Sequence, residues 1–234
     1  MLDDRQKNLL NSIISQYIKT AVPVGSKLVA SDSDFDLSPA TIRNEMAKLE
    51  EAGYIFQPHT SAGRAPTHKG YEFYVANFLK DSDLPAKKQE FLLKTIKSFK
   101  NYEPALVKQL AKGIAELATG TVFVGFSNSD FYYTGLSTLF SQPEFNERRF
   151  VHDVSRVIDH FDQVLEKLFS DVGDDIHILI GRNNPFGMEC SSVITKYEIN
   201  DQIGLVGILG PTRMDYQNNF SLIKCGRNLI SNFR

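Results

Sequence analysis

The sequence has no tryptophan and only two cysteines among its 234 residues. Cys190 and Cys225 are far apart and lack the spacing of a metal-binding motif, which favours reduced, buried thiols in a reducing compartment. No apolar run approaches the roughly 20 residues that span a bilayer. The N-terminus lacks the basic and then apolar pattern of a signal peptide. These absences predict a cytoplasmic protein that does not enter a membrane.

Known signatures of catalysis and metal binding are also missing. There is no glycine-rich phosphate loop ending in Gly-Lys-Ser or Gly-Lys-Thr, no Gly-x-Ser-x-Gly elbow and no His-Glu-x-x-His. His152 and His160 are eight residues apart on an expected helix, but no third metal ligand is evident nearby. We therefore expect no enzyme activity, no cofactor and no metal site.

Charge of one sign is not in excess, either overall or near the N-terminus. The net charge is −2, and residues 1–80 hold nine cations and nine anions. A strongly basic domain would be the stronger indication of nucleic-acid binding. If residues 1–80 do bind nucleic acid, the balance predicts that one copy binds weakly. This favours a homodimer on a two-fold symmetric site.

What the sequence does contain is a well-marked helix between residues 39 and 52. Ser38 is a good N-cap, and Pro39 suits the first helical position, which needs no N–H donor. Gly53 suits the left-handed residue that commonly ends a helix. An earlier helix is expected over residues 3–20, starting at Asp3 or Asp4.

Two short runs after this helix predict a hairpin, residues 55–57 and 65–67. The tip between them, residues 59–64, is small and polar and carries one cation. Pro58 and Pro66 would stiffen the hairpin and reduce the ordering cost of binding. A helix followed by a polar hairpin is the layout of a winged helix-turn-helix, which binds double-stranded DNA.

At about 100° per residue, the helix over residues 39–52 has an apolar side and a polar side. Ile42, Met46 and Leu49 share the apolar side and are expected to pack on the domain core. Asn44, on the opposite side, has the donor and acceptor that match adenine, and Arg43 has the fork that matches guanine or a phosphate. An ordinary surface helix has the same pattern, so this alternative stays open on the helix alone.

The helix, the hairpin and a short second helix define a candidate DNA-binding surface. We expect Ser26 to cap the second helix, which runs from Lys27 to about Ser31. Arg64 is expected to enter the minor groove or to hold a phosphate, and a solvated hairpin tip is the alternative. The predicted DNA-binding residues are Ser26, Lys27, Ser38, Ala40, Thr41, Arg43, Asn44, Lys48, Gln57, His59, Thr60, Ser61 and Arg64.

Several motifs in residues 1–78 follow one another in a recognisable order. They are Pro-Val-Gly-Ser-Lys at residues 23–27, Ser-Pro-Ala-Thr-Ile-Arg-Asn-Glu-Met at 38–46, Gln-Pro-His-Thr-Ser-Ala-Gly-Arg at 57–64, Pro-Thr at 66–67 and Gly-Tyr at 70–71. This part resembles the N-terminal domain of the HrcA family, the heat-inducible transcription repressors of bacteria. The octapeptide at residues 57–64 is far more specific than a generic helix-turn-helix pattern.

The resemblance implies a homodimer that binds double-stranded DNA at an inverted-repeat operator of the CIRCE type. The genes implied are chaperone operons of the groE and dnaK type. It also implies that the GroEL chaperonin helps to keep the repressor active, and that heat stress inactivates it. None of these properties follows from composition or spacing.

Residues 79–118 are expected to form a helical connector that is also a candidate dimer contact. Its lysines suit the solvated face of such helices, with DNA contact as the alternative. Beyond it, antiparallel strands flanked by helices predict an α+β domain. The expected strands are residues 122–126, 131–133, 176–181, 189–199 and 203–209. One helix is expected over 147–170 and another over 215–232, with Gly210-Pro211 turning the chain.

Four segments of this second half also match the HrcA family. They are residues 135–145, 180–181, 190–193 and 210–216. In the family they lie in a domain of GAF-like fold, so the resemblance implies a reduced GAF-like domain here. Only about fifteen residues lie between Ala118 and Tyr133, where typical members have much of the sheet and an inserted dimerisation domain. The chain thus resembles a shortened member, and the family's dimer geometry does not carry over.

The sequence as a whole predicts an α+β protein in three parts. These are a winged helix-turn-helix DNA-binding domain (1–78), a helical connector (79–118) and a reduced GAF-like regulatory domain (119–234). Two other functions stay open: a small molecule in the C-terminal domain that gates DNA binding, or a winged helix used for protein docking. Arg213 is expected either in an ion pair within a turn or in contact with an anionic ligand.

Overall fold

The computed structural model of the protein describes residues 2–31, 37–101, 103–127, 130–146 and 148–233. The chain forms two compact units, Met1–Leu79 and Lys80–Arg234, which we call unit 1 and unit 2. Within the described ranges, no helix is both long and apolar enough to cross a membrane.

Unit 1 begins with two helices whose N-termini are capped differently. Helix α1, Asp4–Thr20, is capped by Asp3, whose side chain accepts from the Gln6 N–H at 2.8 Å, while the Gln6 side chain accepts from the Asp3 N–H at 3.2 Å. This is a capping box. Helix α2, Ser26–Ala30, has Gly25 as its N-cap, without a side-chain cap. The prediction that Ser26 caps this helix is wrong, because Ser26 already has helical geometry.

The third helix and the hairpin form where the sequence predicts them. Helix α3, Pro39–Glu51, is capped by Ser38, and Gly53 follows with a φ of +76°. Strands β1, Ile55–Phe56, and β2, Ala65–Pro66, are antiparallel, each one residue shorter than predicted. Helix α4, His68–Phe78, follows, with Thr67 as its N-cap.

Unit 2 is built on a five-stranded sheet in the order β4-β3-β7-β6-β5, antiparallel throughout. The α+β class and the expected strands are therefore confirmed. The strands are β3 Thr121–Gly125, β4 Phe131–Thr134, β5 His177–Ile180, β6 Cys190–Ile199 and β7 Gln202–Pro211. Because β7 continues to Pro211, which pairs with Cys190, the expected turn at Gly210-Pro211 is wrong. The turn comes just after Pro211.

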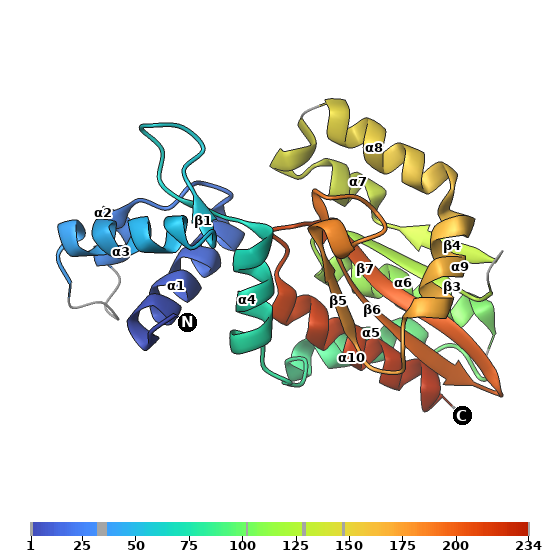
Figure 1. The fold of residues 1–234 in the computed structure, drawn as a ribbon. Helices are drawn as coiled ribbons and strands as arrows, with labels where there is room; N and C mark the ends of the chain where they lie inside the picture. The colour runs from blue at the N-terminus through green and yellow to red at the C-terminus, as the bar shows by residue number, and fades with distance from the viewer. Residues whose placement is uncertain (1, 32–36, 102, 128–129, 147, 234) are drawn as a thin grey trace. The chain divides into compact units, whose positions relative to one another are not determined.

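Helices cover both faces of this sheet (Figure 1). On one side are α5 Ala86–Ile96, α6 Pro104–Leu117 and α10 Tyr216–Ser231, so the helices predicted as a connector lie within unit 2. On the other side are α7 Leu136–Phe140, α8 Arg148–Asp159 and α9 Phe161–Asp171, with 3-10 turns η1 Pro143–Asn146 and η2 Gly181–Asn183. The roles predicted for the three parts of the chain stay predictions.

The single helix predicted over residues 147–170 is in fact two helices. They are separated at His160, whose φ of −121° and ψ of 33° are not helical. The break gives α9 its own direction, so that Phe161, Leu165 and Leu168 are buried in the core between the helices and the sheet. A continuous apolar periodicity therefore concealed a change of helix axis.

Candidate nucleic-acid interface

Burial divides α3 into the two sides that its periodicity predicts. Ile42, Met46 and Leu49 are at most 3% exposed. The opposite side is open to solvent and holds Ala40, Arg43, Asn44, Ala47, Lys48 and Glu51. Among the carboxylates that the structure describes, none pairs with Arg43. The side of α3 that carries Asn44 and Arg43 is thus available for contact.

Ser38 and Thr41, two of the predicted DNA-binding residues, form hydrogen bonds at the N-terminus of α3. The Ser38 hydroxyl accepts from the Thr41 N–H at 3.2 Å, and the hydroxyls of Ser38 and Thr41 are 2.9 Å apart. The helix N-terminus carries a partial positive charge from its free N–H groups. Ser38 and Thr41 therefore shape an end of α3 that favours an anion, whether or not they contact it themselves.

Lys48 is paired with a carboxylate that sequence reasoning missed. The Lys48 Nζ lies 2.8 Å from Oε1 of Glu45, and Gln6 of α1 donates to Oε2 of Glu45 at 3.3 Å. The hydrogen bond from Lys48 lowers the pKa of Glu45, although burial acts in the opposite direction. Glu45 is only 8% exposed, and its contact with Gln6 places it on the side of α3 that faces α1. The i, i+3 spacing of Glu45 and Lys48 was the available signal.

Glu50 of α3 is joined to both ends of the hairpin loop. Its Oε1 accepts from the Gln57 N–H at 2.9 Å. Its Oε2 lies 2.9 Å from Nε of Arg64, an ion pair without the alignment of a hydrogen bond. Helical periodicity could not indicate this pairing, because Glu50 and Arg64 are 14 positions apart.

The hairpin tip is ordered by the side chain of Gln57, which precedes it. The Gln57 amide donates to the carbonyl oxygens of Thr60 at 3.0 Å and Ala62 at 2.9 Å. His59, Thr60 and Ser61 are exposed. Gln57 therefore folds the tip, while the exposed residues present it to solvent.

Backbone pairing fixes the end of the tip to the segment before α2. Val24 and Arg64 exchange two backbone hydrogen bonds of 2.8 and 2.9 Å. Because α2 also packs on α3, the structure brings the exposed Lys27 into the same unit as the α3 face and the hairpin. Ser26 is half-buried at the start of α2.

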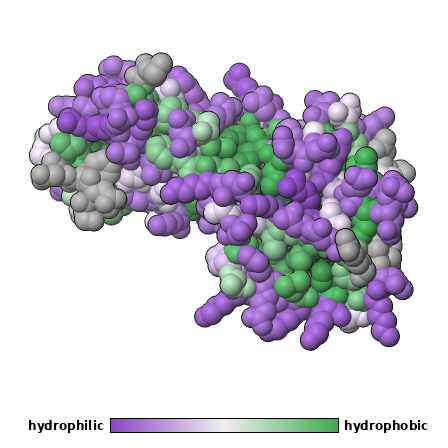
Figure 2. Space-filling view, turned by 90° about the horizontal axis from the view of Figure 1, so that it is seen from below, coloured by the Kyte–Doolittle hydropathy of each residue, from purple (hydrophilic) through white to green (hydrophobic). Residues whose placement is uncertain are grey.

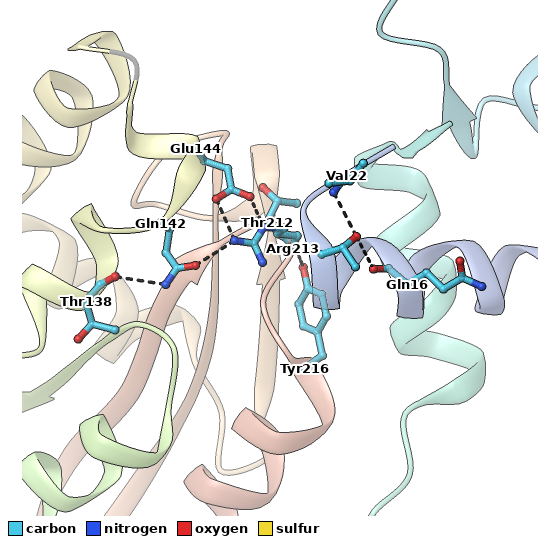
Figure 3. A network of polar contacts seen from close by, with 9 residues as sticks. Gln16, Val22, Thr138, Gln142, Glu144, Thr212, Arg213 and Tyr216 are labelled. Atoms are coloured by element: carbon cyan, nitrogen blue, oxygen red, sulfur yellow. Dashed lines mark hydrogen bonds and ion pairs between the residues drawn. The ribbon is translucent and has the colours of Figure 1, made fainter. Parts of the chain in front are cut away.

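Unit 2 carries a separate polar network around Arg213 (Figure 3). The Arg213 guanidinium forms an ion pair with Glu144 and donates to the side-chain oxygen of Gln142 at 2.9 Å. The Tyr216 hydroxyl donates to the carbonyl of Thr212. The expected ion pair within a turn is confirmed, and it ties the end of β7 to η1 and the residue before it.

A groove lies between α5 and α10 of unit 2 and has a volume of about 940 Å³. The face seen in Figure 2 shows hydrophobic side chains bordered by hydrophilic ones in this part of the molecule. Apolar lining comes from Leu84, Leu93, Ile96, Phe99, Leu229 and Phe233. Cys225 also lines it, and burial raises the pKa of its thiol. Over the described part of the chain, no group of His, Cys, Asp and Glu side chains is arranged to hold a metal ion.

Aromatic rings fill the space on the opposite face of the sheet. The ring of Phe123 lies 5.1 Å from that of Phe186 and 5.6 Å from that of Phe161, centroid to centroid. Phe161 and Phe186 are 5.6 Å apart. A second groove, of about 550 Å³, lies between α8 and α9, so the α5–α10 groove is the larger of these two sites.

Together these features define a two-unit α+β protein with an exposed polar helix and a braced hairpin in its N-terminal unit. Residues 71–219 match the family described as HrcA protein C terminal domain. Since this match covers more than half of the sequence, the chain belongs to the HrcA family.

Curated relatives of the chain are each named heat-inducible transcription repressor HrcA. The protein of Natranaerobius thermophilus is 28% identical over 95% of this chain and 94% of its own length. That of Brevibacillus brevis is 29% identical over 92% and 93%, and that of Acetivibrio thermocellus is 47% identical over 50% and 33%. The first alignment has 325 positions and this chain has 234 residues. At least 91 positions therefore have no counterpart here, as expected of a shortened member.

A solved structure has the same fold. The crystal structure of a hypothetical protein superposes with a TM-score of 0.81, covering 100% of this chain and 98% of its own, at 21% identity. At that identity the likeness shows the fold alone.

Proposed function

We propose that the chain is a heat-inducible transcription repressor whose unit 1 is a winged helix-turn-helix that binds double-stranded DNA. The observation that carries the proposal is the exposed side of α3, with Asn44 and Arg43 beside a braced hairpin, in a member of the HrcA family. The names of the relatives support the repressor function. Repression requires no covalent chemistry, since a bound protein occludes polymerase from the promoter.

In this proposal α3 lies in the major groove. Asn44 pairs with an adenine, and Arg43 contacts a guanine or a phosphate. Ala40 and Ala47 are small enough to let the helix backbone approach the base edges. The exposed side chains of the hairpin tip and Lys27 contact the sugar–phosphate backbone, which sets the register of α3 but carries no sequence information. Arg64 enters the minor groove, where a directed arginine fork adds to sequence preference.

The proposed operator is an inverted repeat of the CIRCE type in chaperone promoters, bound by a homodimer. A dimer suits the balanced charge of unit 1, because the phosphate contacts of one copy supply little affinity. Unit 2 is proposed to be a reduced GAF-like regulatory domain, with GroEL as a modulator that keeps the repressor folded in the cytoplasm.

Fluorescence anisotropy of the full chain on labelled duplexes tests DNA recognition. We expect tighter binding to the inverted repeat than to a scrambled duplex, with affinity that falls as salt rises. Asn44→Ala should reduce the preference for one base pair by about 10- to 100-fold, the range for a bidentate base contact. Asn77→Ala, the same change at an exposed position of α4, is the matched control and should have no effect. Equal binding to both duplexes at every salt concentration would reject DNA recognition and favour a protein-docking module.

A second candidate function is a small molecule that gates DNA binding through unit 2. The α5–α10 groove favours it, because its volume and apolar lining suit a small ligand. A metabolite screen by thermal shift, with and without GroEL, separates the two functions. A ligand that raises the melting temperature, protects Cys225 from a thiol reagent and alters operator affinity would support gating. Stabilisation by GroEL without any such ligand would support the chaperonin-dependent repressor.

A further inference from the structure

One carboxylate of α3 closes the hairpin loop from both sides. Gln57 directly follows β1, and Arg64 directly precedes β2. The two oxygens of Glu50 are shared between them, with one on the Gln57 N–H at 2.9 Å and the other 2.9 Å from the Arg64 Nε. Because Oε1 is held by a backbone group, Oε2 has a fixed position beside Arg64, where it attracts the guanidinium through charge rather than through an aligned hydrogen bond.

We propose that Glu50 is a positioning residue that aims the Arg64 guanidinium at DNA. This inference rests on the DNA-binding function proposed above. An arginine has five N–H donors in a rigid fork, and the ion pair with Glu50 is made at Nε. The backbone of Arg64 is itself held by two hydrogen bonds to Val24. In the proposed complex, with the Arg64 backbone fixed and Nε beside Glu50, the terminal nitrogens of the fork bind two acceptors on DNA; in the free protein the Arg64 side chain is 18% exposed.

The same carboxylate also organises the tip in advance of binding. It fixes the backbone of Gln57, and the Gln57 amide in turn holds the carbonyls of Thr60 and Ala62. Ordering a loop before binding removes part of the entropy cost that binding would otherwise carry. Glu50 thus favours DNA binding by ordering the loop, although its negative charge lies near the DNA phosphates and opposes binding.

That negative charge determines the expected effect of removing it. Every DNA duplex is negatively charged and repels the Glu50 carboxylate. Removing that carboxylate therefore strengthens non-specific binding, which depends on charge alone. Specific binding depends on the direction of the Arg64 fork, so it weakens when Glu50 no longer holds Nε. Glu50 therefore raises the ratio of specific to non-specific affinity.

A double-mutant cycle in the full chain tests this role. Glu50→Gln, Arg64→Ala and the double variant are measured by anisotropy on the inverted-repeat and scrambled duplexes. We expect Glu50→Gln to lower the specificity ratio about tenfold, the effect of one misdirected bidentate contact. In the Arg64→Ala background the same change should alter the ratio by less than about twofold, because Glu50 acts through Arg64.

Glu116→Gln is the matched control, since it removes the same charge from an exposed helix position outside the proposed DNA-binding surface. We expect it to leave the ratio unchanged. An equal loss in Glu116→Gln, or an undiminished effect of Glu50→Gln without Arg64, would overturn the positioning role. So would a wild-type ratio in Glu50→Gln. A wild-type protein that prefers neither duplex would overturn the proposed function and this role together.

Arg64→Lys keeps the test decisive if Glu50→Gln fails to fold. Lysine retains the charge but has neither Nε nor a fork. We expect the specificity ratio to fall about tenfold while the salt dependence stays as in the wild type. Retention of the wild-type ratio in Arg64→Lys would show that only the charge matters and would refute the proposal.

Discussion

Replacing Gly63 with alanine tests how closely the hairpin tip approaches the segment before α2. A Cβ atom at residue 63 would lie 2.5 Å from the Pro23 carbonyl oxygen and 2.5 Å from the Val24 carbonyl carbon. Both are backbone atoms, so no side-chain rotation relieves the clash. The methyl group fits only if the tip moves away, which breaks the two hydrogen bonds between Val24 and Arg64.

The cost follows from these contacts. Two backbone hydrogen bonds contribute about 1 kcal/mol each, and forcing a methyl group into a closed contact costs about 1–3 kcal/mol. We expect Gly63→Ala to destabilise unit 1 by about 2 kcal/mol if only the two hydrogen bonds are lost, and by up to about 5 kcal/mol if both effects occur in full.

Hydrogen exchange followed by NMR measures this directly. The amides of Val24 and Arg64 should lose protection in Gly63→Ala, and operator affinity should fall because Arg64 is displaced. Gly173→Ala is the matched control, since its added Cβ would meet only the His177 ring nitrogen at an ordinary 3.5 Å. If both amides stayed protected and the unfolding free energy changed by less than about 0.5 kcal/mol, the close approach of Gly63 to Pro23 would be wrong.

Three further predictions concern caps, charge and thiols. Ser38→Ala should destabilise unit 1 by about 1 kcal/mol in urea unfolding, and Ser38→Gly by a few tenths, because the cap to the Thr41 N–H is lost. The lowered pKa of Glu45 implies stability that is present above the ordinary value of 4.5 and lost as pH falls through the lower folded value. Glu45→Gln should therefore flatten the acid limb of a stability–pH curve. Burial raises the pKa of Cys190 to about 12, so a thiol reagent at pH 8 should label Cys225 in the native protein and Cys190 only after denaturation, as peptide mass spectrometry would show.

The elements of unit 1 were predictable because their signals are local. Ser38, Pro39 and Gly53 set the ends of α3 within one residue, and each acts on its immediate neighbours along the chain. The exposed side of α3 followed from periodicity in the same way. The N-cap of α2 was predicted one residue too late: the capping preference of serine indicated Ser26, whereas the structure has Gly25 at that position.

Long-range pairings could not be predicted in this way. Gln6 and Glu45 are 39 positions apart, and no periodicity connects them or relates Glu50 to Arg64. The division of the 147–170 helix at His160 has the same origin, since burial of Phe161 in the core decides the direction of α9. Propensity and spacing describe single elements, whereas these features depend on how elements pack against one another.

The carboxylates of Glu45 and Glu50 reduce the number of unpaired cations on the predicted DNA-binding surface of unit 1. Four cations, Lys27, Arg43, Lys48 and Arg64, belong to the predicted DNA-binding surface, and the structure pairs Lys48 with Glu45 and Arg64 with Glu50. An arginine or lysine that keeps its carboxylate releases little of the counterion atmosphere of DNA, although it still donates directed hydrogen bonds. In the proposed complex, Lys27 and Arg43 then supply most of the charge-driven affinity of one copy. A surface of this kind favours sequence selectivity over high affinity at each half-site. This is the physical reason for the proposed dimer, because only two copies together make enough contacts for tight binding.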